Sequence, residues 1–595
     1  MERPDPSLSI TESCELLAAS ALFGHFPEEQ RTSIAKRIKW KFIPGRSILF
    51  HKGERGDSMY LMASGRLALQ ADIERNITYE VARGDNFGEL ALVTDTPRTA
   101  TAVALRDSVV GELEREDFMW LITKEPQVGW GMLRILADWL VKPRVITDAS
   151  PRITAWILFG QESTLGPVHR SIADVAERIG ADVITAENCN LGSLAGRIEE
   201  AERKGSRIVL VGANDNEEWT TAITRQADRI HVVPPISHEA GALKDLERWK
   251  GIATDLVVVH PPETINPKGT SRWTEAIGKV RIHHVRQQHQ DDLSRLARHI
   301  SGKAIGLVLG GGGARGLAHI GVIKALHEHK IPIDIIGGSS IGAVMAGLYA
   351  QGRSWQEMYE LSRKVWIGLA PTRSFTLPVH AVWRNGPIAK SVQMTYNGAT
   401  FEDGWIQSFA TTSNLNTQSI QDHDSGSLER WVKASIAFPG CAPPVPSEEG
   451  DVLVDGGVLD NLPWSSMRSR TSGPIIVVDV SSRWPHRVSA DAPPPSGWRS
   501  LFRNLMFKAP TKGHLFPYLG EVVLASAVLA SSKASKEAVA AADVAIRPNV
   551  QDIGLFSWKE IDHIVDLGYK ATIELLDENN SSPSSVRLRS LVKAT

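Results

Sequence analysis

A serine between two glycines has the surroundings of an enzymatic nucleophile. The string Gly338-x-Ser340-x-Gly342 follows an apolar run and precedes the small-residue stretch AVMAGLYA. This predicts a strand, a tight turn and a helix, the setting of a nucleophile elbow, in which flanking glycines permit a strained turn that exposes the hydroxyl. Ser339 does not fit this frame, because Ile341 would then have to be glycine. Ser340 is therefore the candidate nucleophile.

A glycine-rich loop earlier in the chain can hold negative charge. The segment Gly310–Gly316 (GGGGARG) follows an apolar strand and leads into a predicted helix. Backbone amides at such a helix start attract anions. The loop fits an oxyanion hole. It also fits a dinucleotide site, since Gly311, Gly313 and Gly316 satisfy G-x-G-x-x-G. That site needs an acidic residue at the end of the second strand, whereas Asp334 opens that strand, and the loop alone decides nothing.

An activated serine needs a base. A hydrolase with a triad would supply an acid and then a histidine after the serine, but no later histidine has a local signature. These histidines are His380, His423, His486, His514 and His563. Asp455 ends a strand-like run and is followed by two glycines, so its carboxylate can reach a neighbouring loop. An Asp-Gly turn explains the same residues, and the spacing leaves both interpretations open.

A second constellation lies near the N-terminus. Gly88 and Glu89 precede a short apolar turn, and Arg98 and Thr99 follow it. A carboxylate can accept hydrogen bonds from ribose hydroxyls, and a guanidinium pairs with phosphate oxygens. A surface ion pair of little energetic value is the alternative.

Four segments in order resemble the patatin-like phospholipases. They are GGGGARG (310–316), GGSSIGA (337–343), ASIAFP (434–439) and DGG (455–457). The resemblance implies a Ser340–Asp455 dyad with no histidine. It also implies an oxyanion hole in the glycine loop, from Gly311, Gly312, Gly313 and Arg315. No metal or other cofactor is expected for catalysis, because the sequence shows no cluster of His, Cys and carboxylate residues with ligand spacing. The resemblance is strong over about 304–470, weaker to about 576, and replaces the dinucleotide interpretation.

The N-terminal constellation resembles the phosphate-binding cassette of cyclic-nucleotide-binding domains, over about residues 20–140. The resemblance assigns Glu89 to the ribose hydroxyl, Arg98 to the cyclic phosphate and Thr99 to guanine. Gly88 belongs to the same expected site. It makes cGMP or cAMP a candidate regulator.

Between these regions, strand-like and helical runs alternate, which predicts a parallel α/β domain. Its first loop, Gly160–Gly166, is one residue longer than a P-loop, and Pro167 stands where lysine is required. The expected fold is therefore multidomain: a β-roll, a Rossmann-like α/β domain and a patatin-like α/β domain. The expected boundaries are a leader 1–20, the roll 20–145, the middle domain 150–285, a connecting helix 286–303, the hydrolase 304–576 and a disordered tail 577–595.

This arrangement is similar to bacterial relatives of neuropathy target esterase. Unlike the animal members, the chain has no N-terminal membrane helix in its sequence, and no window reaches the ~18 apolar residues that spanning requires. We therefore expect a cytoplasmic protein, with peripheral contact at the inner face of the membrane. The stretch 498–508 pairs aromatic and basic residues and fits a lipid interface, although an ordinary packed helix is also compatible with it.

Composition excludes other classes. The 595 residues are 42 % hydrophobic and carry a net charge of −2, so neither disorder over most of the chain nor a nucleic-acid partner is expected. Three cysteines exclude a disulfide scaffold. The leading hypothesis is a serine esterase that cleaves carboxylic esters of phospholipids or lysophospholipids. The alternative is a cyclic-nucleotide sensor with an inactive hydrolase scaffold, and the sequence leaves the oligomeric state open.

Overall fold

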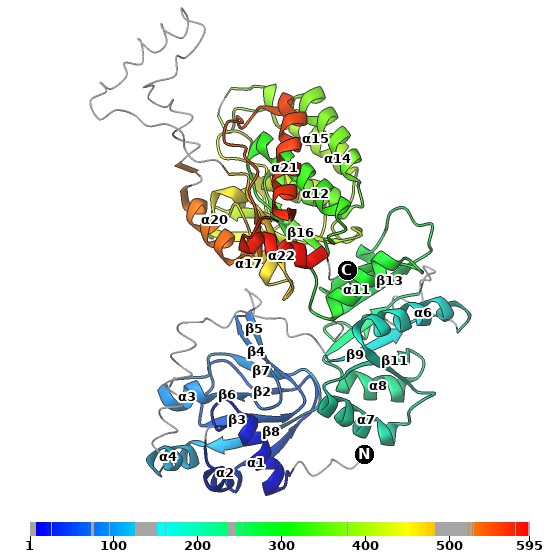
Figure 1. Cartoon of the computed structure of the whole chain (residues 1–595), viewed down its shortest axis with the longest axis vertical. Coiled ribbons are helices and arrows are strands. Elements are labelled where there is room, and N and C mark those ends of the chain that lie inside the picture. Colours follow the sequence, from blue (N-terminus) through cyan, green and yellow to red (C-terminus); the bar gives the residue numbers. More distant parts are fainter. Residues whose placement is uncertain are drawn as a thin grey trace, which may run out of the picture. The chain divides into compact units, whose positions relative to one another are not determined.

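The chain folds into two units with separate cores (Figure 1). The first unit is Met1–Ala304 with Arg468–Gly473, and the second is Ile305–Met467 with Pro474–Thr595. The structure is a computed structural model. It describes residues 7–24, 26–72, 77–94, 96–124, 152–160, 162–235, 246–252, 254–377, 379–481, 522, 526–527, 529–577 and 579–592.

The first unit begins with a β-roll of two antiparallel four-stranded sheets. One sheet has the order β1 (Lys39–Ile43), β8 (Ser108–Glu114), β3 (Ser58–Ser64), β6 (Asn86–Phe87). The other has the order β2 (Ile48–Phe50), β7 (Thr101–Ala104), β4 (Leu67–Asp72), β5 (Ile77–Val81). Exposure alternates along β7, as expected for a strand with one buried face. Stacked rings of Phe50, Tyr60 and Phe87 join the two sheets.

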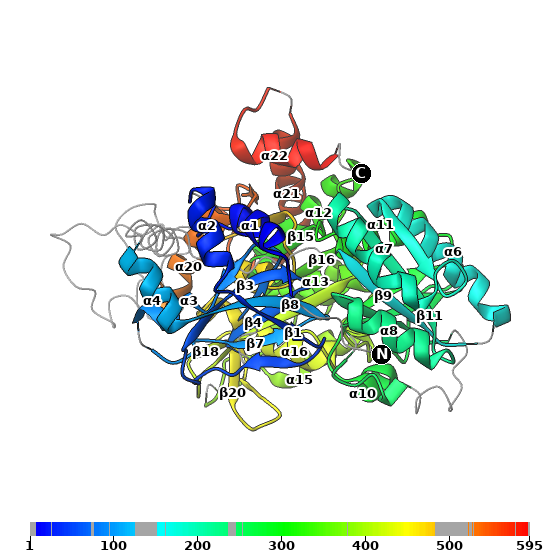
Figure 2. The ribbon, with the colours of Figure 1, turned by 90° about the horizontal axis from the view of Figure 1, so that it is seen from below.

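Helices α1 (Ile10–Ala19) and α2 (Glu28–Ala35) precede the strands of the roll, and α4 (Arg115–Lys124) follows them. The short helix α3 (Glu89–Thr94) lies between β6 and β7. Helices α1 and α2 pack on the sheet that contains β3 and β8 (Figure 2). Ser9 and Glu12 form a capping box at the start of α1, and Leu16 and Leu17 are buried. The segment expected as a leader therefore contains a packed helix.

The middle domain is a parallel six-stranded sheet between two helical layers. Its strand order is β10 (Ala181–Thr185), β11 (Arg207–Ala213), β9 (Ile153–Leu158), β12 (Arg229–Val233), β13 (Asp255–His260), β14 (Arg281–Arg286). One face carries α7 (Leu191–Lys204), α8 (Glu217–Gln226) and α10 (Ser271–Ile277). The other carries α6 (Glu162–Ile179) and α11 (Gln290–Ile300). The second and third strands are exchanged relative to the Rossmann order 3-2-1-4-5-6, so a Rossmann-like topology is not confirmed.

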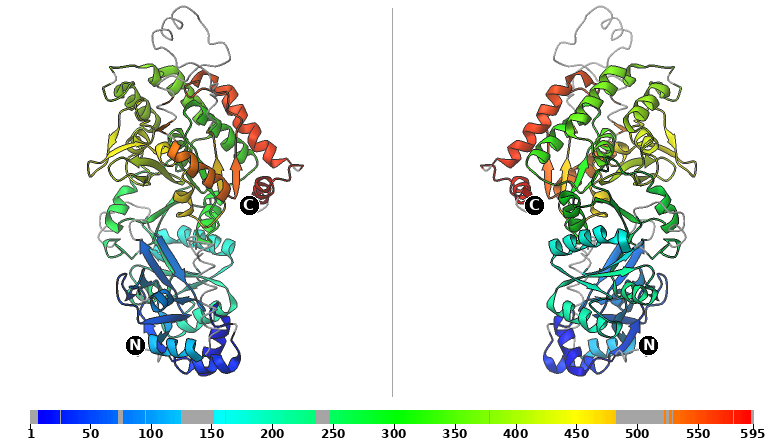
Figure 3. Two further views of the ribbon diagram at one scale, coloured as in Figure 1. Left: turned by 90° about the vertical axis from the view of Figure 1, so that its left-hand side faces the viewer. Right: turned by 90° about the vertical axis from the view of Figure 1, so that its right-hand side faces the viewer.

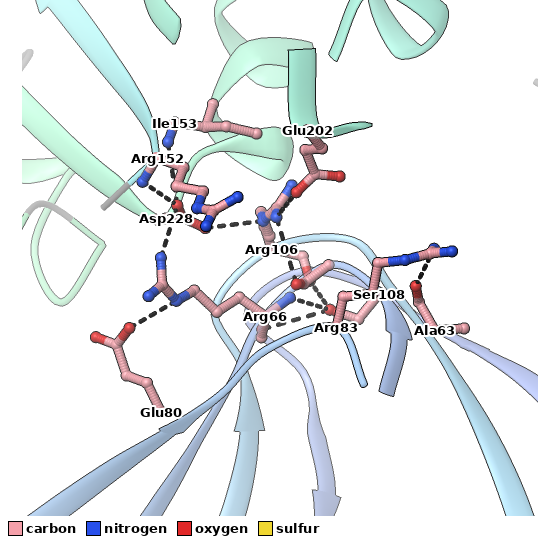
Figure 4. Close-up of polar contacts among 11 residues, drawn as sticks. Ala63, Arg66, Glu80, Arg83, Arg106, Ser108, Arg152, Ile153, Glu202 and Asp228 are labelled. Atoms are coloured by element: carbon pink, nitrogen blue, oxygen red, sulfur yellow. Dashed lines mark hydrogen bonds and ion pairs between the residues drawn. The ribbon is translucent and has the colours of Figure 1, made fainter. Parts of the chain in front are cut away.

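A buried charge cluster joins the roll to the middle domain inside the first unit (Figure 4). Asp228 lies 3.2 Å from Arg66 Nη1 and 2.8 Å from Arg106 Nε, and it accepts hydrogen bonds from two main-chain N–H groups at the start of β9. Burial favours the neutral acid, but Arg106 and Arg66 outweigh it and hold the pKa of Asp228 below its usual value. Arg106 also pairs with Glu202, and Arg66 with Glu80. Breaking such a buried network by removing one partner is costly, so the two domains are firmly attached.

The second unit is built on a mixed eight-stranded sheet. Its order is β19 (Val445–Pro446), β20 (Val452–Asp455), β17 (Gln407–Asn414), β16 (Ile335–Ser339), β15 (Gly306–Leu309), β21 (Ile475–Val478), β22 (Val544–Ile546), and β18 (Ser419–His423) also pairs with β17. The strands from β17 to β22 along this order are parallel, so their carboxyl ends lie at one edge of the sheet. Strand β15 is buried along its whole length, as expected for a parallel strand covered on both faces.

Helices surround this sheet (Figure 1). They are α12 (Ala318–Glu328), α13 (Ile341–Ala350), α14 (Trp355–Ser362), α15 (Asn385–Tyr396), α16 (Leu428–Ser435), α17 (Trp464–Arg468), α20 (Leu529–Ala541), α21 (Ile561–Leu576) and α22 (Pro583–Val592). Shorter turns are η1 (Gly313–Leu317), the π-helix η2 (Arg363–Leu369), η3 (Pro371–Arg373), η4 (Gly456–Val458) and η5 (Trp558–Glu560). Helix α21 packs on α12 and runs along the outside of this unit in both views of Figure 3.

Helix α22 lies within the expected disordered tail. Its Leu588 and Leu591 are buried in the core of this unit, which overrides the Ser- and Asn-rich composition that predicts disorder. That part of the prediction is wrong. Within the described ranges, no helix is long and apolar enough to cross a membrane. The aromatic and basic stretch 498–508 lies outside the described residues.

Candidate active site

Ser340 forms the turn between β16 and α13 in a strained backbone conformation. Its φ is +55° and its ψ −127°, a backbone conformation that residues other than glycine rarely adopt. The flanking glycines are required by close packing, since a Cβ at Gly338 or Gly342 would lie 2.2 or 2.0 Å from the carbonyl oxygen of Leu309. The turn therefore has the geometry of a nucleophile elbow.

This strain predicts a stability difference between two variants that both lack the hydroxyl. Ser340→Gly relieves the strained φ, which is worth ~1–3 kcal/mol, and loses part of that to glycine's chain entropy of ~0.5–1 kcal/mol. We expect Ser340→Gly to exceed Ser340→Ala in stability by about 1 kcal/mol. Parallel thermal unfolding of the two variants measures this difference, and an equal or lower melting temperature for the glycine variant would contradict it.

The Ser340 hydroxyl donates a hydrogen bond of 2.6 Å to Oδ2 of Asp455. Asp455 ends β20, which pairs with β17 next to β16, so sheet pairing brings the two side chains together across 115 residues. The other carboxylate oxygen accepts from the N–H of Gly457 at 2.8 Å. Asp455 is 1 % exposed, and burial raises its pKa to about 7 despite these two hydrogen bonds. A carboxylate with this pKa is suited to general-base work at neutral pH.

Two contacts that the sequence did not reveal hold the elbow. The Ser435 hydroxyl accepts from the N–H of Ser340 at 2.9 Å and donates to the carbonyl of Thr411 at 2.7 Å. The Ser339 hydroxyl donates to the carbonyl of Asp460 at 2.7 Å and is fully buried. Ser435 belongs to the ASIAFP segment, and the resemblance of that segment to the family was the sequence feature that could have pointed to Ser435.

The glycine loop has a limited number of free amides. Gly311 N–H donates to the carbonyl of Asn461 at 3.3 Å, and Arg315 N–H donates to Gly312. The Nε of the Arg315 side chain donates a hydrogen bond to the carbonyl of Ile553 at 2.7 Å. Among the described residues, no acceptor takes the N–H of Gly312 or Gly313. The expected oxyanion group of Gly311, Gly312, Gly313 and Arg315 is thereby narrowed to two available amides.

A buried histidine and a half-buried asparagine position this loop. His319 lies under it, with Nε2 donating to the carbonyl of Gly310 at 2.8 Å. Burial lowers the pKa of His319 to about 4, so the ring is neutral at neutral pH. Asn461 donates from Nδ2 to the carbonyl of Gly311 at 3.0 Å. Nothing in the sequence distinguished either residue, because both contacts depend on the folded backbone.

The histidines that follow Ser340 in the sequence are the possible alternative bases. Those among the described residues form no hydrogen bond with the Ser340–Asp455 pair. His423 hydrogen bonds to Thr412 at 2.8 Å and stacks on Trp431, and burial lowers its pKa to about 4. His380 and His563 are exposed, and none of these three has a hydrogen bond to Ser340 or Asp455. His486 and His514 lie outside the described residues.

Ser340, Asp455 and the glycine loop line a cavity of about 1480 Å³. It lies where the carboxyl ends of parallel strands meet, the usual ligand position in α/β sheets. Part of its wall is aromatic, with the rings of Trp366, Trp383, Phe438, Phe556 and Trp558. The lining residues from α20 and from the segment after β22 include the exposed cations Lys536 and Arg547, and Asp479 also lines the cavity. An elongated molecule with an apolar and an anionic end would find partners for both ends in this lining.

In the roll, the structure brings Gly88 and Arg98 together. The Arg98 guanidinium donates to the carbonyls of Gly88 at 2.9 Å and Ser58 at 2.8 Å, and it lies over the ring of Phe50. Arg98 and Glu89 are buried, and Thr99 is exposed. The Nε of Arg98 is buried with no hydrogen-bond acceptor among the described residues. A buried donor without an acceptor fits a site for an anionic group such as a cyclic phosphate.

Comparisons with known proteins match two parts of the chain to family models. A family model described as patatin-like phospholipase matches residues 307–468, and one described as cyclic nucleotide-binding domain matches residues 40–125. A solved cyclic nucleotide-binding domain from Methylobacillus flagellatus is 24 % identical, covers 22 % of this chain and 77 % of its own, and has a TM-score of 0.20.

Similar proteins are known along nearly the whole chain. An uncharacterized NTE family protein of Mycobacterium bovis is 29 % identical over 96 % of this chain and 97 % of its own length. Neuropathy target esterase sws of Drosophila melanogaster is 28 % identical over 89 % of this chain and 42 % of its own length. Patatin-like phospholipase domain-containing protein 6 of Homo sapiens is 27 % identical over 90 % of this chain and 44 % of its own length.

The protein is thus a hydrolase with a patatin-like phospholipase domain that follows a cyclic nucleotide-binding domain in the sequence. Its homologues are proteins of the NTE family, and it spans less than half the length of the insect and human members. The two domains expected from the motifs are thus matched by these family models.

Proposed function

We propose that the protein hydrolyses the carboxylic ester of lysophospholipids and phospholipids with a Ser340–Asp455 dyad. The observation that carries this proposal is the 2.6 Å hydrogen bond between the two side chains at the wall of a cavity lined by aromatic rings and by two exposed cations. Ionised Asp455 takes the Ser340 proton as the oxygen attacks the acyl carbonyl carbon. The N–H groups of Gly312 and Gly313 then hydrogen bond to the oxygen on which negative charge develops.

The remaining steps reuse the same groups. Protonated Asp455 gives its proton to the leaving glycerol oxygen as the carbon–oxygen ester bond breaks, which leaves the acyl group on Ser340. Water then attacks this acyl-enzyme, and Asp455 accepts the water's proton and returns it to Ser340 as the fatty acid leaves. The buried position of Asp455 favours this cycle because its pKa of about 7 allows both protonation states at neutral pH.

The substrate class follows from the residues that line the cavity. An acyl chain would lie against the aromatic rings, and an anionic phosphate would lie near Lys536 and Arg547. Fungal relatives bear the name lysophospholipase. A cavity this large exceeds the ~300–1,000 Å³ of usual small-molecule sites and suits a lipid.

The test compares two esters that share an acyl chain. Fatty acid release by the full chain is measured with a lysophosphatidylcholine and with the monoacylglycerol that lacks its phosphate group. We expect faster turnover of the phospholipid. Equal or faster turnover of the monoacylglycerol would overturn the phospholipid assignment while leaving an esterase.

We further propose that the roll binds a cyclic nucleotide, cGMP or cAMP, through Arg98 and Glu89, with Thr99 favouring cGMP. The unpaired Nε of Arg98 supports this second function. The alternative of a sensor with an inactive hydrolase is disfavoured by the intact contact between Ser340 and Asp455. Any effect of the nucleotide on hydrolysis would be a coupling free energy of ~1–3 kcal/mol.

Arg98→Ala is expected to weaken cyclic nucleotide binding by ~2–5 kcal/mol, since a partly buried phosphate would lose its charge partner. Glu89→Ala should cost less, ~1.5–3 kcal/mol, because it removes a charge-assisted hydrogen bond. Calorimetry of the full chain with each nucleotide measures both, and Thr99→Ala should weaken cGMP more than cAMP. Arg55→Ala, at an exposed arginine of the same roll, is the matched control. Absence of binding heat with either nucleotide in the unaltered chain would contradict the proposal.

A further inference from the structure

A loop of the second unit exposes three apolar side chains. Phe375 is 61 % exposed, Leu377 79 % and Val379 70 %; these residues are called the apolar tip. Scattered exposed apolar residues are common, but several together mark a surface that contacts a protein or a membrane. None of the three lines the cavity.

The base of this loop is fixed beside the cavity. Phe375 pairs with Trp383 as an isolated antiparallel bridge. The N–H groups of Val382 and Trp383 donate to the carbonyls of Gly440 and Cys441, both at 2.9 Å. Trp383 and Cys441 line the cavity, and the Trp383 ring meets Phe556 edge to face. The backbone therefore holds the apolar tip next to the wall that would receive the acyl chain.

The stretch of sequence that contains the tip carries charge of a single sign. Residues 361–401 contain five lysines and arginines and no aspartate or glutamate. Lys364 in η2 and Lys390 in α15, the elements that flank the loop in sequence, are both exposed. An apolar tip within a basic segment matches a surface of anionic lipids, where apolar groups enter the interface and cations attract the headgroups.

We infer that the apolar tip inserts into an anionic lipid surface and places the cavity at the membrane from which a lipid is taken. The inference deepens the proposed lipid hydrolysis and gives that site its docking surface. Lipid binding itself is measured without turnover, so the two proposals can fail separately.

The first test measures binding of the full chain to sedimented vesicles. One set is phosphatidylcholine and the other phosphatidylcholine with phosphatidylglycerol. The tip variant Phe375→Ser, Leu377→Ser, Val379→Ser should bind at least about tenfold more weakly to the mixed vesicles, since three apolar side chains lose burial. The control Ile265→Ser, Leu415→Ser, Ile420→Ser removes three other exposed apolar side chains and should bind like the unaltered chain.

The second test separates charge from apolar insertion. Lys364→Gln with Lys390→Gln should reduce binding to mixed vesicles by up to about fivefold for each charge removed. Binding to phosphatidylcholine alone should stay the same. Equal loss on both vesicle types would overturn the role of charge.

Three outcomes would overturn the inference. They are no binding of the unaltered chain to either vesicle, unchanged binding of the tip variant, and a tip variant that loses self-association but not vesicle binding, which would make the surface a contact between two copies. Hydrolysis of a water-soluble short-chain ester should be unchanged in the tip variant, whereas hydrolysis of vesicle lipid should fall with binding. If the unaltered chain cleaves neither ester but binds vesicles, the proposed function fails and the docking surface stands.

Discussion

Ser340→Ala is expected to abolish ester hydrolysis and labelling by a fluorophosphonate probe. The hydroxyl is the atom that the probe modifies, and no described hydroxyl other than Ser340 donates to Asp455. Removing the nucleophile of a serine hydrolase lowers kcat about 10⁶-fold, and the residual activity comes from the oxyanion hole and substrate binding. Labelling of the full chain, read on a gel, and release of fatty acid from lysophosphatidylcholine measure the two losses.

Ser339→Ala is the matched control one position away. The Ser339 hydroxyl is fully buried and donates to the Asp460 carbonyl, away from Asp455. This variant should keep measurable activity and labelling, at a cost in stability of ~1–3 kcal/mol for the unsatisfied carbonyl. Full activity of Ser340→Ala, or a Ser339 variant that alone is dead while folded, would move the nucleophile and contradict the assignment.

The nucleophile elbow could be predicted from the sequence, whereas the contact between Ser340 and Asp455 could not. The elbow was readable because a strained turn restricts its flanks to glycine, and Gly338 and Gly342 indeed lie against the Leu309 carbonyl. The partner Asp455 was readable as a strand end but not as a contact. Its place beside Ser340 depends on β20 pairing antiparallel with β17, which local pattern does not specify.

The supporting groups were beyond sequence reasoning for a related reason. Ser435 accepts a hydrogen bond from a backbone N–H 95 residues away, and Asn461 donates one to a backbone carbonyl 150 residues away. His319 is spaced like any residue of an apolar helix, and only the fold places it under Gly310. The amide count of the glycine loop likewise required coordinates, since GGGGARG does not show which N–H groups have acceptors. Composition misled at α22, where a few buried leucines outweigh polar neighbours.

Asp455→Asn is expected to be nearly as inactive as Ser340→Ala. The amide cannot accept the serine proton, and in a Ser–His–Asp protease loss of the general base costs about as much as loss of the serine, ~10⁶-fold in kcat. Members of one catalytic unit are not additive, so the double variant should be no worse than Ser340→Ala. His380→Ala and His563→Ala, at exposed histidines, should retain activity. A single folded histidine variant as inactive as Asp455→Asn would replace the dyad by a triad.

The pKa of Asp455 gives this prediction a dependence on pH. Burial raises that pKa to about 7, and only the ionised carboxylate acts as base, so kcat/KM of the unaltered chain should fall about tenfold per pH unit below that value. Stability runs the opposite way. The folded state holds a proton on Asp455 up to about pH 7, whereas the unfolded carboxyl loses it near 3.8. The unaltered chain therefore loses stability as pH rises between those two values.

The neutral amide has no charge to bury. Asp455→Asn should thus match the unaltered chain in melting temperature near pH 4 and exceed it at pH 8, while remaining inactive at both. Thermal unfolding across this range, read beside the rate profile, ties the catalytic and the structural consequences to one carboxyl group. A variant whose melting temperature falls below that of the unaltered chain at pH 8 would show that Asp455 is ionised in the folded protein well below neutral pH.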